Sequence, residues 1–437
     1  MHELIPSSPG KERTVLVAAQ VKNARPLLRL EDSLLELAML ADTAGMEVVG
    51  QTIQRMQQID PNTYVGSGKV EEIKEQMIEL DAQSIIFDDE LSPRHQRQLE
   101  REFGENTKVL DRSALILDIF AQHARTKEGA LQIELAQYEY RLPRLTRQWT
   151  HLARQAGGGS ARGGTGGVGL RGPGETQLEV DKREISRKIS KLKEELEHVR
   201  EHRRQYRGQR SRAGIPVIAI VGYTNAGKST LLRTITGSDV YVANQLFATL
   251  DPLTRKVDLP SGRHVLMTDT VGFIQKLPTN LIAAFRATLE EIIEADLLLH
   301  VVDASHPNVL QHIETVEDTL AELEMPPVPR ILVWNKIDQL DNTNLPLRIG
   351  REHYVAEIPI SAQNNVGVDT LLASIEDVLN SYLRKTKLSI PYQRGDLVSQ
   401  LFELATVEGQ EHTEDGVILT VQLPLSLQER FKQFQIN

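Results

Sequence analysis

The residues best suited to chemistry lie between Val221 and Thr230, where the chain reads VGYTNAGKST. Gly222, Gly227, Lys228 and Ser229 have the spacing G-x-x-x-x-G-K-S, which is typical of a loop that wraps a chain of phosphates. In such a loop the backbone N–H groups face the anion at a helix N-terminus, where the helix dipole favours negative charge. Lys228 is expected to meet the β- and γ-phosphates of a nucleotide, and the Ser229 hydroxyl is expected to bind Mg²⁺.

A plain glycine turn between a strand and a helix is the alternative for this stretch. The flanking sequence favours the phosphate loop, because PVIAIV (216–221) is typical of a buried strand and Leu231, Leu232 and Ile235 repeat at helical spacing. Strand, glycine loop and helix together are the context that the motif requires.

Two further stretches predict the rest of the phosphate and magnesium site. Thr249, in LFATLDP, is expected to cap Mg²⁺ and the γ-phosphate. Asp269 of DTVG is expected to hold Mg²⁺ through water, and the Gly272 amide is expected to sense the γ-phosphate. Lys228, Thr249 and Gly272 are therefore the predicted catalytic residues.

The last two stretches, NKID (335–338) and SAQ (361–363), predict a guanine site. The Asp338 carboxylate accepts hydrogen bonds from guanine N1–H and N2–H₂, whereas adenine would leave it unsatisfied. Lys336 is expected along the base and Asn335 is expected to join two loops. The predicted nucleotide-binding residues are Gly222, Tyr223, Thr224, Asn225, Ala226, Gly227, Lys228, Ser229, Thr230, Phe247, Thr249, Asp269, Gly272, Asn335, Lys336, Asp338, Ser361, Ala362 and Gln363.

Two residues bear on the rate of hydrolysis. Phe273 follows DTVG, where many GTPases have a glutamine that orients the attacking water. A phenyl ring cannot hydrogen-bond that water, so we expect slow hydrolysis until a partner or a cation assists. Asn225, in the phosphate loop, either binds a cation or makes a capping hydrogen bond within its loop.

The composition limits the classes of protein and of site that are possible. The chain has 437 residues, 40% of them hydrophobic and 25% charged, with no cysteine, so we expect two to four domains and exclude disulfides and thiolate metal sites. No apolar run reaches the ~18 residues of a membrane span, and the N-terminus lacks the apolar core of a signal peptide.

The charge is distributed unevenly. The net charge is −10, yet the stretch from Arg141 to Arg212 has 18 Lys or Arg and 8 Asp or Glu, a local balance of +10. Clustered basic residues in an acidic chain indicate an element that binds a polyanion. A solvated charged helix face is the alternative. The RNA-binding candidates are Arg162, Arg171, Arg203, Arg204 and Arg207.

Hydrophobic periodicity predicts an α/β protein with four parts. Residues 1–128 alternate strands and helices and predict a parallel sheet, with a tight turn at YVGSGKV (64–70). Residues 129–213 predict a basic helical hairpin with a glycine-rich loop (157–175), in which Pro143 should kink the first helix. Residues 214–385 predict a mostly parallel sheet with helices on both faces. Residues 386–437 predict a small α+β domain of two strands and two helices.

With these motifs in order, the chain resembles the HflX family of ribosome-associated GTPases. Outside the nucleotide motifs the resemblance rests on TAGMEVVG, DELSPRHQRQLE, LDRSALILDIFAQHA, ELAQYEYRLPRL and RGPGETQLE. It implies the same four parts, binding to the large ribosomal subunit, and rescue of stalled ribosomes by splitting them. It also implies that Asn225 is a candidate K⁺ ligand, since it matches the asparagine that binds K⁺ in related GTPases with a hydrophobic residue after DTVG.

The favoured hypothesis is a Mg²⁺-dependent, GTP-switched translation factor. A ribosome-assembly or RNA-remodelling GTPase is the second, and a nucleotide-gated RNA-binding module with incidental hydrolysis is the third. We expect a cytoplasmic monomer and allow for peripheral association with a membrane.

Overall fold

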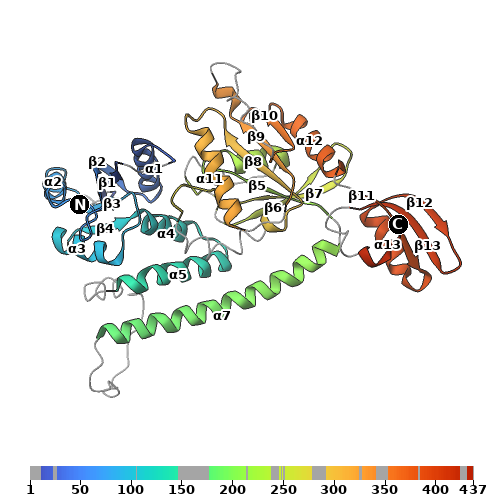
Figure 1. Cartoon of the computed structure of the whole chain (residues 1–437), viewed down its shortest axis with the longest axis horizontal. Coiled ribbons are helices and arrows are strands. Elements are labelled where there is room, and N and C mark those ends of the chain that lie inside the picture. The colour runs from blue at the N-terminus through green and yellow to red at the C-terminus, as the bar shows by residue number, and fades with distance from the viewer. Residues whose placement is uncertain are drawn as a thin grey trace, which may run out of the picture. The chain divides into compact units, whose positions relative to one another are not determined.

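The fold is that of a computed structural model, shown in Figure 1. Its contacts divide the chain into one unit of Met1–Glu197 with Lys276–Phe285, and another of His198–Gln275 with Arg286–Asn437. Within the part of the chain that the structure describes, no helix is long and apolar enough to cross a membrane. The described residues are 11–22, 27–104, 106–145, 177–212, 215–237, 246–247, 249, 251–277, 292–323, 327–340, 353–381, 384–423 and 431–436.

The N-terminal region is a four-stranded sheet in the order β2-β1-β3-β4, and it is wholly parallel, as the sequence predicts. Helices α2 and α3 bury Val70, Ile73 and Leu99 against one face of the sheet, and α1 contacts β1 and α4. The elements are β1 (Arg13–Val21), α1 (Leu30–Thr43), β2 (Glu47–Met56), α2 (Ser67–Glu79), β3 (Ser84–Phe87), α3 (Pro93–Phe103), β4 (Lys108–Asp111) and α4 (Arg112–His123).

The tight turn predicted at 64–70 is confirmed only in part: the turn runs from Asp60 to Gly66, and residues 67–70 form the first turn of α2. Asp60 and Tyr64 exchange two backbone hydrogen bonds, and Tyr64 has a left-handed φ of 67°. The Asp60 carboxylate also accepts the backbone N–H groups of Asn62 and Thr63 at 2.8 and 2.9 Å. These contacts fix the turn before α2 begins at Ser67.

Two helices of the basic region pack on each other, α5 (Lys127–Arg141) and α7 (Gln177–Arg212). Leu135 lies in one cluster with Leu192 and Leu196. The predicted kink at Pro143 is wrong: α5 ends at Arg141 and the 3₁₀ turn η1 (Leu142–Arg144) follows, because proline lacks the N–H that would continue the helix. The glycine-rich loop lies outside the described residues.

The nucleotide-motif region is a six-stranded sheet in the order β10-β9-β8-β5-β7-β6. All neighbouring strands are parallel except β6, an antiparallel edge strand that the sequence analysis missed. Its elements are β5 (Val217–Val221), α8 (Lys228–Thr236), β6 (Leu253–Asp258), β7 (His264–Asp269), β8 (Leu297–Asp303), α11 (Val309–Glu322), β9 (Arg330–Asn335), η2 (Ile337–Gln339), β10 (Ala356–Pro359) and α12 (Val368–Ser381).

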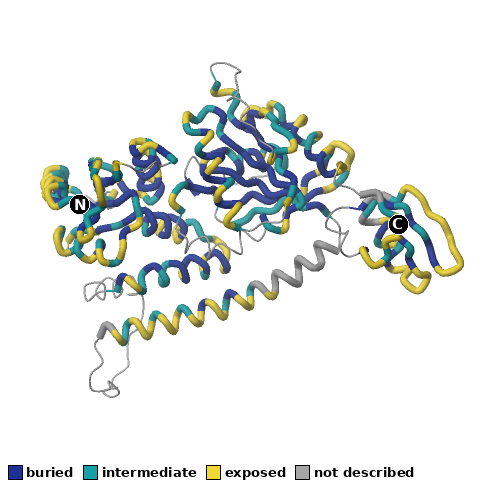
Figure 2. The backbone as a smooth tube through the Cα atoms, in the orientation of Figure 1, coloured by how far each residue is buried: buried dark blue, intermediate teal, exposed yellow. Residues whose placement is uncertain are grey.

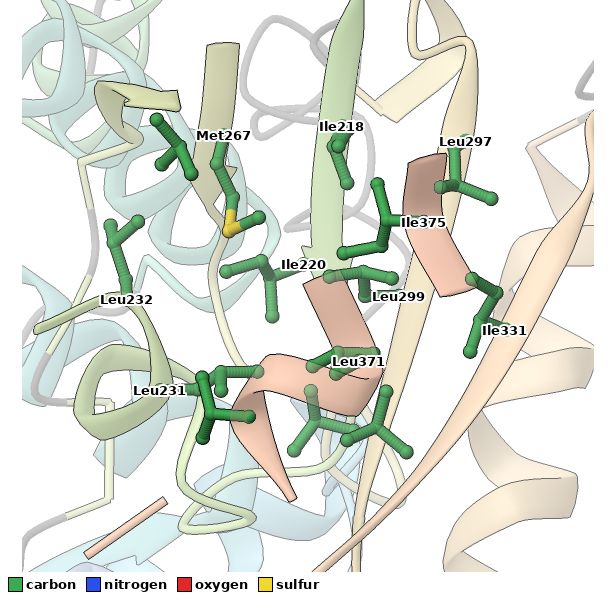
Figure 3. Packing of buried hydrophobic residues seen from close by; sticks show 14 of the residues in the cluster. Ile218, Ile220, Leu231, Leu232, Met267, Leu297, Leu299, Ile331, Leu371 and Ile375 are labelled. Atoms are coloured by element: carbon green, nitrogen blue, oxygen red, sulfur yellow. The ribbon is translucent and has the colours of Figure 1, made fainter. Parts of the chain in front are cut away.

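Helices cover both faces of this sheet because successive strand residues point to opposite sides. On one face, Leu299 and Ile331 meet Leu231 of α8 and Leu371 of α12 (Figure 3). On the other face, Val302, Leu332 and Trp334 pack against Val309 and Ile313 of α11. Figure 2 shows the central strands buried along their length. This double cover holds the strand ends that carry the motifs.

The C-terminal region is an antiparallel sheet in the order β12-β13-β11-β14, with Leu397 and Leu401 of α13 on its core. The sequence analysis missed β12. The predicted final helix, SLQERFKQF (426–434), lies mostly outside the described residues; in its described part Phe431 is helical and a 3₁₀ turn follows, before a short strand. The elements are β11 (Arg384–Pro391), η3 (Tyr392–Arg394), α13 (Gly395–Leu404), β12 (Thr406–His412), β13 (Gly416–Leu423), η4 (Lys432–Phe434) and β14 (Gln435–Ile436).

Candidate functional site

The phosphate loop connects β5, which ends at Val221, to α8, which begins at Lys228. Its first and last glycines cannot be replaced without strain. Gly222 has φ 152°, and a Cβ there would lie 2.2 Å from the Val301 carbonyl oxygen. Gly227 has φ 96°, and a Cβ there would lie 2.2 Å from Nδ2 of Asn335. The two glycines therefore allow the loop to pack directly against the neighbouring strand ends.

Lys228 lies at the base of this loop with its side chain buried. Its ammonium donates to the carbonyl oxygens of Tyr223 at 2.8 Å and Gly222 at 3.1 Å. Burial lowers the pKa of Lys228 to about 8, although the charge of Asp269 acts in the opposite direction. Because its hydrogen-bond acceptors among the described residues are neutral carbonyls, this buried ammonium is suited to receive an anion.

Three oxygen-bearing side chains meet beside Lys228, although they are far apart in sequence. The Ser229 hydroxyl donates to Oδ2 of Asp269 at 2.6 Å and lies 2.8 Å from Oγ1 of Thr249. Oδ1 of Asp269 is buried without a hydrogen-bond partner among the described residues. Burial raises the pKa of the Asp269 carboxyl, and Lys228 opposes that shift.

These three oxygens fit a hard divalent cation that keeps several of its waters, as Mg²⁺ does. Among the described residues no group of three His, Cys, Asp or Glu could hold a metal by itself. The fit therefore rests on one carboxylate and two hydroxyls, together with oxygens that a bound phosphate would supply.

The segment after Asp269 is paired with the phosphate loop. The N–H of Thr224 donates to the Phe273 carbonyl at 2.8 Å, and the N–H of Phe273 donates to the Gly222 carbonyl at 3.1 Å. A Cβ at Gly272 would lie 2.9 Å from Cα of Thr224 and 3.1 Å from Nζ of Lys228. The Gly272 backbone thus lies next to the predicted phosphate position, and Phe273 is buried.

At the other end of the site, Asn335 joins two loops. Its Nδ2 donates to the Ala226 carbonyl at 2.8 Å, and its Oδ1 accepts the Ala362 N–H at 3.0 Å. Asp338 follows in η2 with an exposed carboxylate. Ser361 pairs with Val366 through two backbone hydrogen bonds of 3.0 Å, which closes the SAQ turn. The motif therefore gathers the phosphate loop and the predicted base loops in one place.

Lys336 has a partner that the sequence analysis missed. Its ammonium lies 2.6 Å from Oδ2 of Asp303, at the end of β8. Lys336 also has a left-handed φ of 62°, which turns the chain out of β9. No sequence pattern links these two residues, because the pairing depends on β8 and β9 being neighbours in the sheet.

The remaining predicted residues have varied surroundings. Asn225 is exposed and has φ 59°. Its side chain makes no hydrogen bond to any described residue, so no capping contact is seen in that part of the chain. Phe247 is buried with φ 58°. Thr230 lies in the first turn of α8, and Gln363 is exposed in the SAQ turn.

The RNA-binding candidates fall largely outside the structure. Arg162 and Arg171 lie outside the described residues. Arg203, Arg204 and Arg207 belong to α7, but their side chains are outside the described part of that helix.

Four family models match successive parts of the chain. They are described as GTP-binding GTPase N-terminal (residues 31–121), GTP-binding GTPase Middle Region (123–210), 50S ribosome-binding GTPase (217–336) and HflX C-terminal domain (349–432).

Similar proteins cover nearly the whole chain. A GTPase HflX of Caldanaerobacter subterraneus is 45% identical over 98% of this chain and 94% of its own length. GTPase HflX of Escherichia coli is 42% identical over 90% of each chain. The crystal structure of a GTP-binding protein from Sulfolobus solfataricus in complex with GDP has 25% identity and a TM-score of 0.43, covering 84% of this chain and 98% of that one.

Proposed function

Because the chain belongs to the HflX family of GTPases, we propose that it is a translation factor that binds the large ribosomal subunit and splits stalled ribosomes under stress. GTP hydrolysis is the activity of the family. The ribosomal role rests above all on one observation, the local balance of +10 between Arg141 and Arg212 in a chain whose net charge is −10. A cytoplasmic location follows from that role.

In the proposed nucleotide site, Lys228 leaves its two carbonyl partners and pairs with the β- and γ-phosphates. Mg²⁺, when bound, neutralises charge on those phosphates. Ser229 and Thr249 supply hydroxyl oxygens on that side, and Asp269 acts through water. This assignment is supported by the 2.6 and 2.8 Å contacts that already gather the three side chains and by the unpartnered Oδ1 of Asp269.

In the proposed base site, Asp338 accepts from guanine N1–H and N2–H₂, and the SAQ turn offers a backbone N–H to guanine O6. Lys336 lies along the base, and Asp303 sets the position of its ammonium. The exposure of the Asp338 carboxylate supports this role, since it is open to a ligand.

Hydrolysis is proposed to be slow in the free protein. Phe273, which is buried, stands in the chain where many GTPases have a glutamine that orients water. Ribosome binding then positions the attacking water or supplies positive charge that stabilises the transition state. K⁺ bound at the exposed Asn225 is a further candidate for that charge. Basal turnover should therefore rise sharply when ribosomes are added.

Cosedimentation with large subunits, in GDP and in a non-hydrolysable GTP analogue, tests the ribosomal role. Replacing Arg203, Arg204 and Arg207 together by glutamate should weaken binding by roughly tenfold or more. It should also flatten the dependence of log affinity on log salt by about one unit per lost phosphate contact. A matched control reverses three exposed lysines elsewhere: Lys22, Lys127 and Lys256.

Equal binding by the two triple variants across the salt series would show that α7 is only a solvated helix. Binding to precursor particles but not to mature subunits would favour a ribosome-assembly GTPase instead. If binding follows the nucleotide state but a hydrolysis-dead variant still separates intact ribosomes and recycles, hydrolysis is incidental to a nucleotide-gated module.

A further inference from the structure

Tyr223 of the phosphate loop packs against His312 of α11, the helix that covers the face of the sheet opposite α8. Tyr223 is 4% exposed, and its ring lies face to face on that of His312, with centroids 3.8 Å apart and planes inclined by 2°. The ring of His306 also contacts that of His312, tilted by 34° with centroids 4.3 Å apart. Because His312 lies within α11, which is anchored on the sheet through Val309 and Ile313, the stack is a rigid support.

The stack holds a neutral imidazole. Burial, with the neighbouring His306 adding to the effect, lowers the pKa of His312 to about 3. At neutral pH the two rings therefore meet without a charge between them. Two flat rings in contact leave the Tyr223 side chain little freedom to rotate.

The hydroxyl that this stack fixes holds the chain beyond the phosphate sensor. The backbone N–H of Gln275 donates to Oη of Tyr223 at 2.9 Å. Together with the two backbone bonds between Gly222–Thr224 and Phe273, this contact ties the segment from Gly272 to Gln275 to the phosphate loop at both of its ends.

We propose that Tyr223 and His312 are a positioning pair for GTP hydrolysis. The stack fixes the Tyr223 hydroxyl, and the hydroxyl holds the Gln275 backbone so that the Gly272 N–H and the site of the attacking water keep a productive geometry.

Such a device suits a site in which Phe273 cannot hydrogen-bond water. Where no side chain orients the nucleophile, the positioning of the backbone N–H donors decides how well the negative charge of the transition state is stabilised. The hydroxyl faces the main chain of Gln275, so its loss should affect turnover more than nucleotide affinity.

Basal hydrolysis by the full-length protein tests the pair, with kcat and KM for GTP and the Kd for GDP measured together. Tyr223→Phe keeps the stacked ring and removes only the hydroxyl. It should lower kcat about tenfold, the usual effect of one lost hydrogen bond, with the Kd for GDP within about twofold. Tyr354→Phe is the matched control, since it removes another phenol hydroxyl of the same unit, bonded to Nδ1 of His300 at 2.6 Å.

The second arm uses His312. His312→Ala removes the stack and should lower kcat by roughly threefold to tenfold, whereas His312→Phe restores a flat ring and should return kcat to within about twofold of the parent. This arm also decides the matter if Tyr223→Phe proves unstable in thermal unfolding.

Three outcomes would overturn the proposal. They are a Tyr223→Phe variant that turns over like Tyr354→Phe, a Kd for GDP that worsens in step with kcat, and a His312→Phe variant as slow as His312→Ala. None of these measurements involves a ribosome, so their failure is distinct from failure of the ribosomal role.

Discussion

Both parallel sheets of this protein carry charged residues at the carboxyl ends of their strands, but the charges are used differently. In the N-terminal sheet, the buried Arg112 bonds to Asp88 at 2.8 Å and also pairs with Glu36. Asp88 accepts the Ser33 hydroxyl at 2.7 Å as well. In the other sheet, among the described residues, the ammonium of Lys228 donates only to carbonyl oxygens and Oδ1 of Asp269 has no hydrogen-bond partner.

The comparison shows that charged residues at the carboxyl ends of parallel strands do not by themselves make a ligand site. In the first cluster Arg112 pairs with Glu36 and Asp88, and Asp88 also pairs with Lys276 at 2.6 Å, so the cluster joins α1, the end of β3 and α4 and its carboxylates are already bound to cations. Where a cation and a carboxylate each retain hydrogen-bonding capacity, a phosphate and a metal can complete the set. Substitutions should therefore affect stability in the first cluster and turnover in the second.

The largest expected effect is on turnover. Lys228→Ala removes the buried cation and should lower kcat for GTP by about 10³-fold, since preorganised charge contributes most to such reactions. Phosphate release at saturating GTP measures this, and the unfolding midpoint of the N-terminal region should stay unchanged. Parent-like hydrolysis by Lys228→Ala would remove the proposed role of the phosphate loop.

The converse substitution is expected to act on stability. Arg112→Leu leaves the buried Asp88 and Glu36 without their shared partner and should reduce the free energy of unfolding by about 3 kcal/mol. Denaturant titration measures this change, with kcat of the folded fraction as the second readout. Lys11→Ala is the control, because it breaks an exposed ion pair with Asp42 and should have almost no effect. A large fall in kcat with unchanged stability would contradict the comparison.

The base site should show an effect on specificity of about a hundredfold. Asp338→Asn replaces the carboxylate that we propose accepts two guanine N–H groups, so GTP affinity should fall and affinity for xanthosine triphosphate should rise. Competitive binding of the two nucleotides measures the exchange. Unchanged GTP preference in the variant would refute the assignment of Asp338.

The smallest effect is a pH dependence of nucleotide binding. Burial lowers the pKa of Lys228 to about 8, and phosphate oxygens should raise it again in the complex. Above pH 8 the free protein has lost a proton that the complex requires, so binding takes up a proton and weakens by up to about tenfold per pH unit. Calorimetry in buffers of different ionisation enthalpy detects the uptake. Lys228→Ala should abolish it, and an equal slope in that variant would place the titrating group elsewhere.

The sequence predicts the parallel strands and the phosphate loop because their information is local. Neighbouring residues are enough to predict the strand in the run Pro216–Val221, the two loop glycines at which a side chain would be strained, and the start of α8 at Lys228. The N-terminal sheet is predictable for the same reason, since apolar runs alternate there with amphipathic helices.

The features that the sequence does not reveal depend on tertiary pairing. Strands β6 and β12 are polar edge strands with the sequences LTRKVD and TVEGQEH. Neither sequence has a clear strand pattern of its own, and both become strands by pairing with a neighbour, β7 or β13. The contacts of Asp303 with Lys336 and of His312 with Tyr223 join residues 33 and 89 positions apart, on elements brought together by the sheet. The Pro143 kink is wrong because α5 ends before the proline.

The antiparallel edge strand β6 also limits how far the Thr249 hydroxyl can travel. Leu253, the first residue of β6, is registered opposite Asp269 at the end of β7. Thr249 is four residues from Leu253, and an extended chain spans at most ~3.6 Å per residue, so Thr249 is tethered within about 14 Å of that point. If Thr249 is the Mg²⁺ ligand that we propose, this tether would make its rebinding after release an intramolecular step.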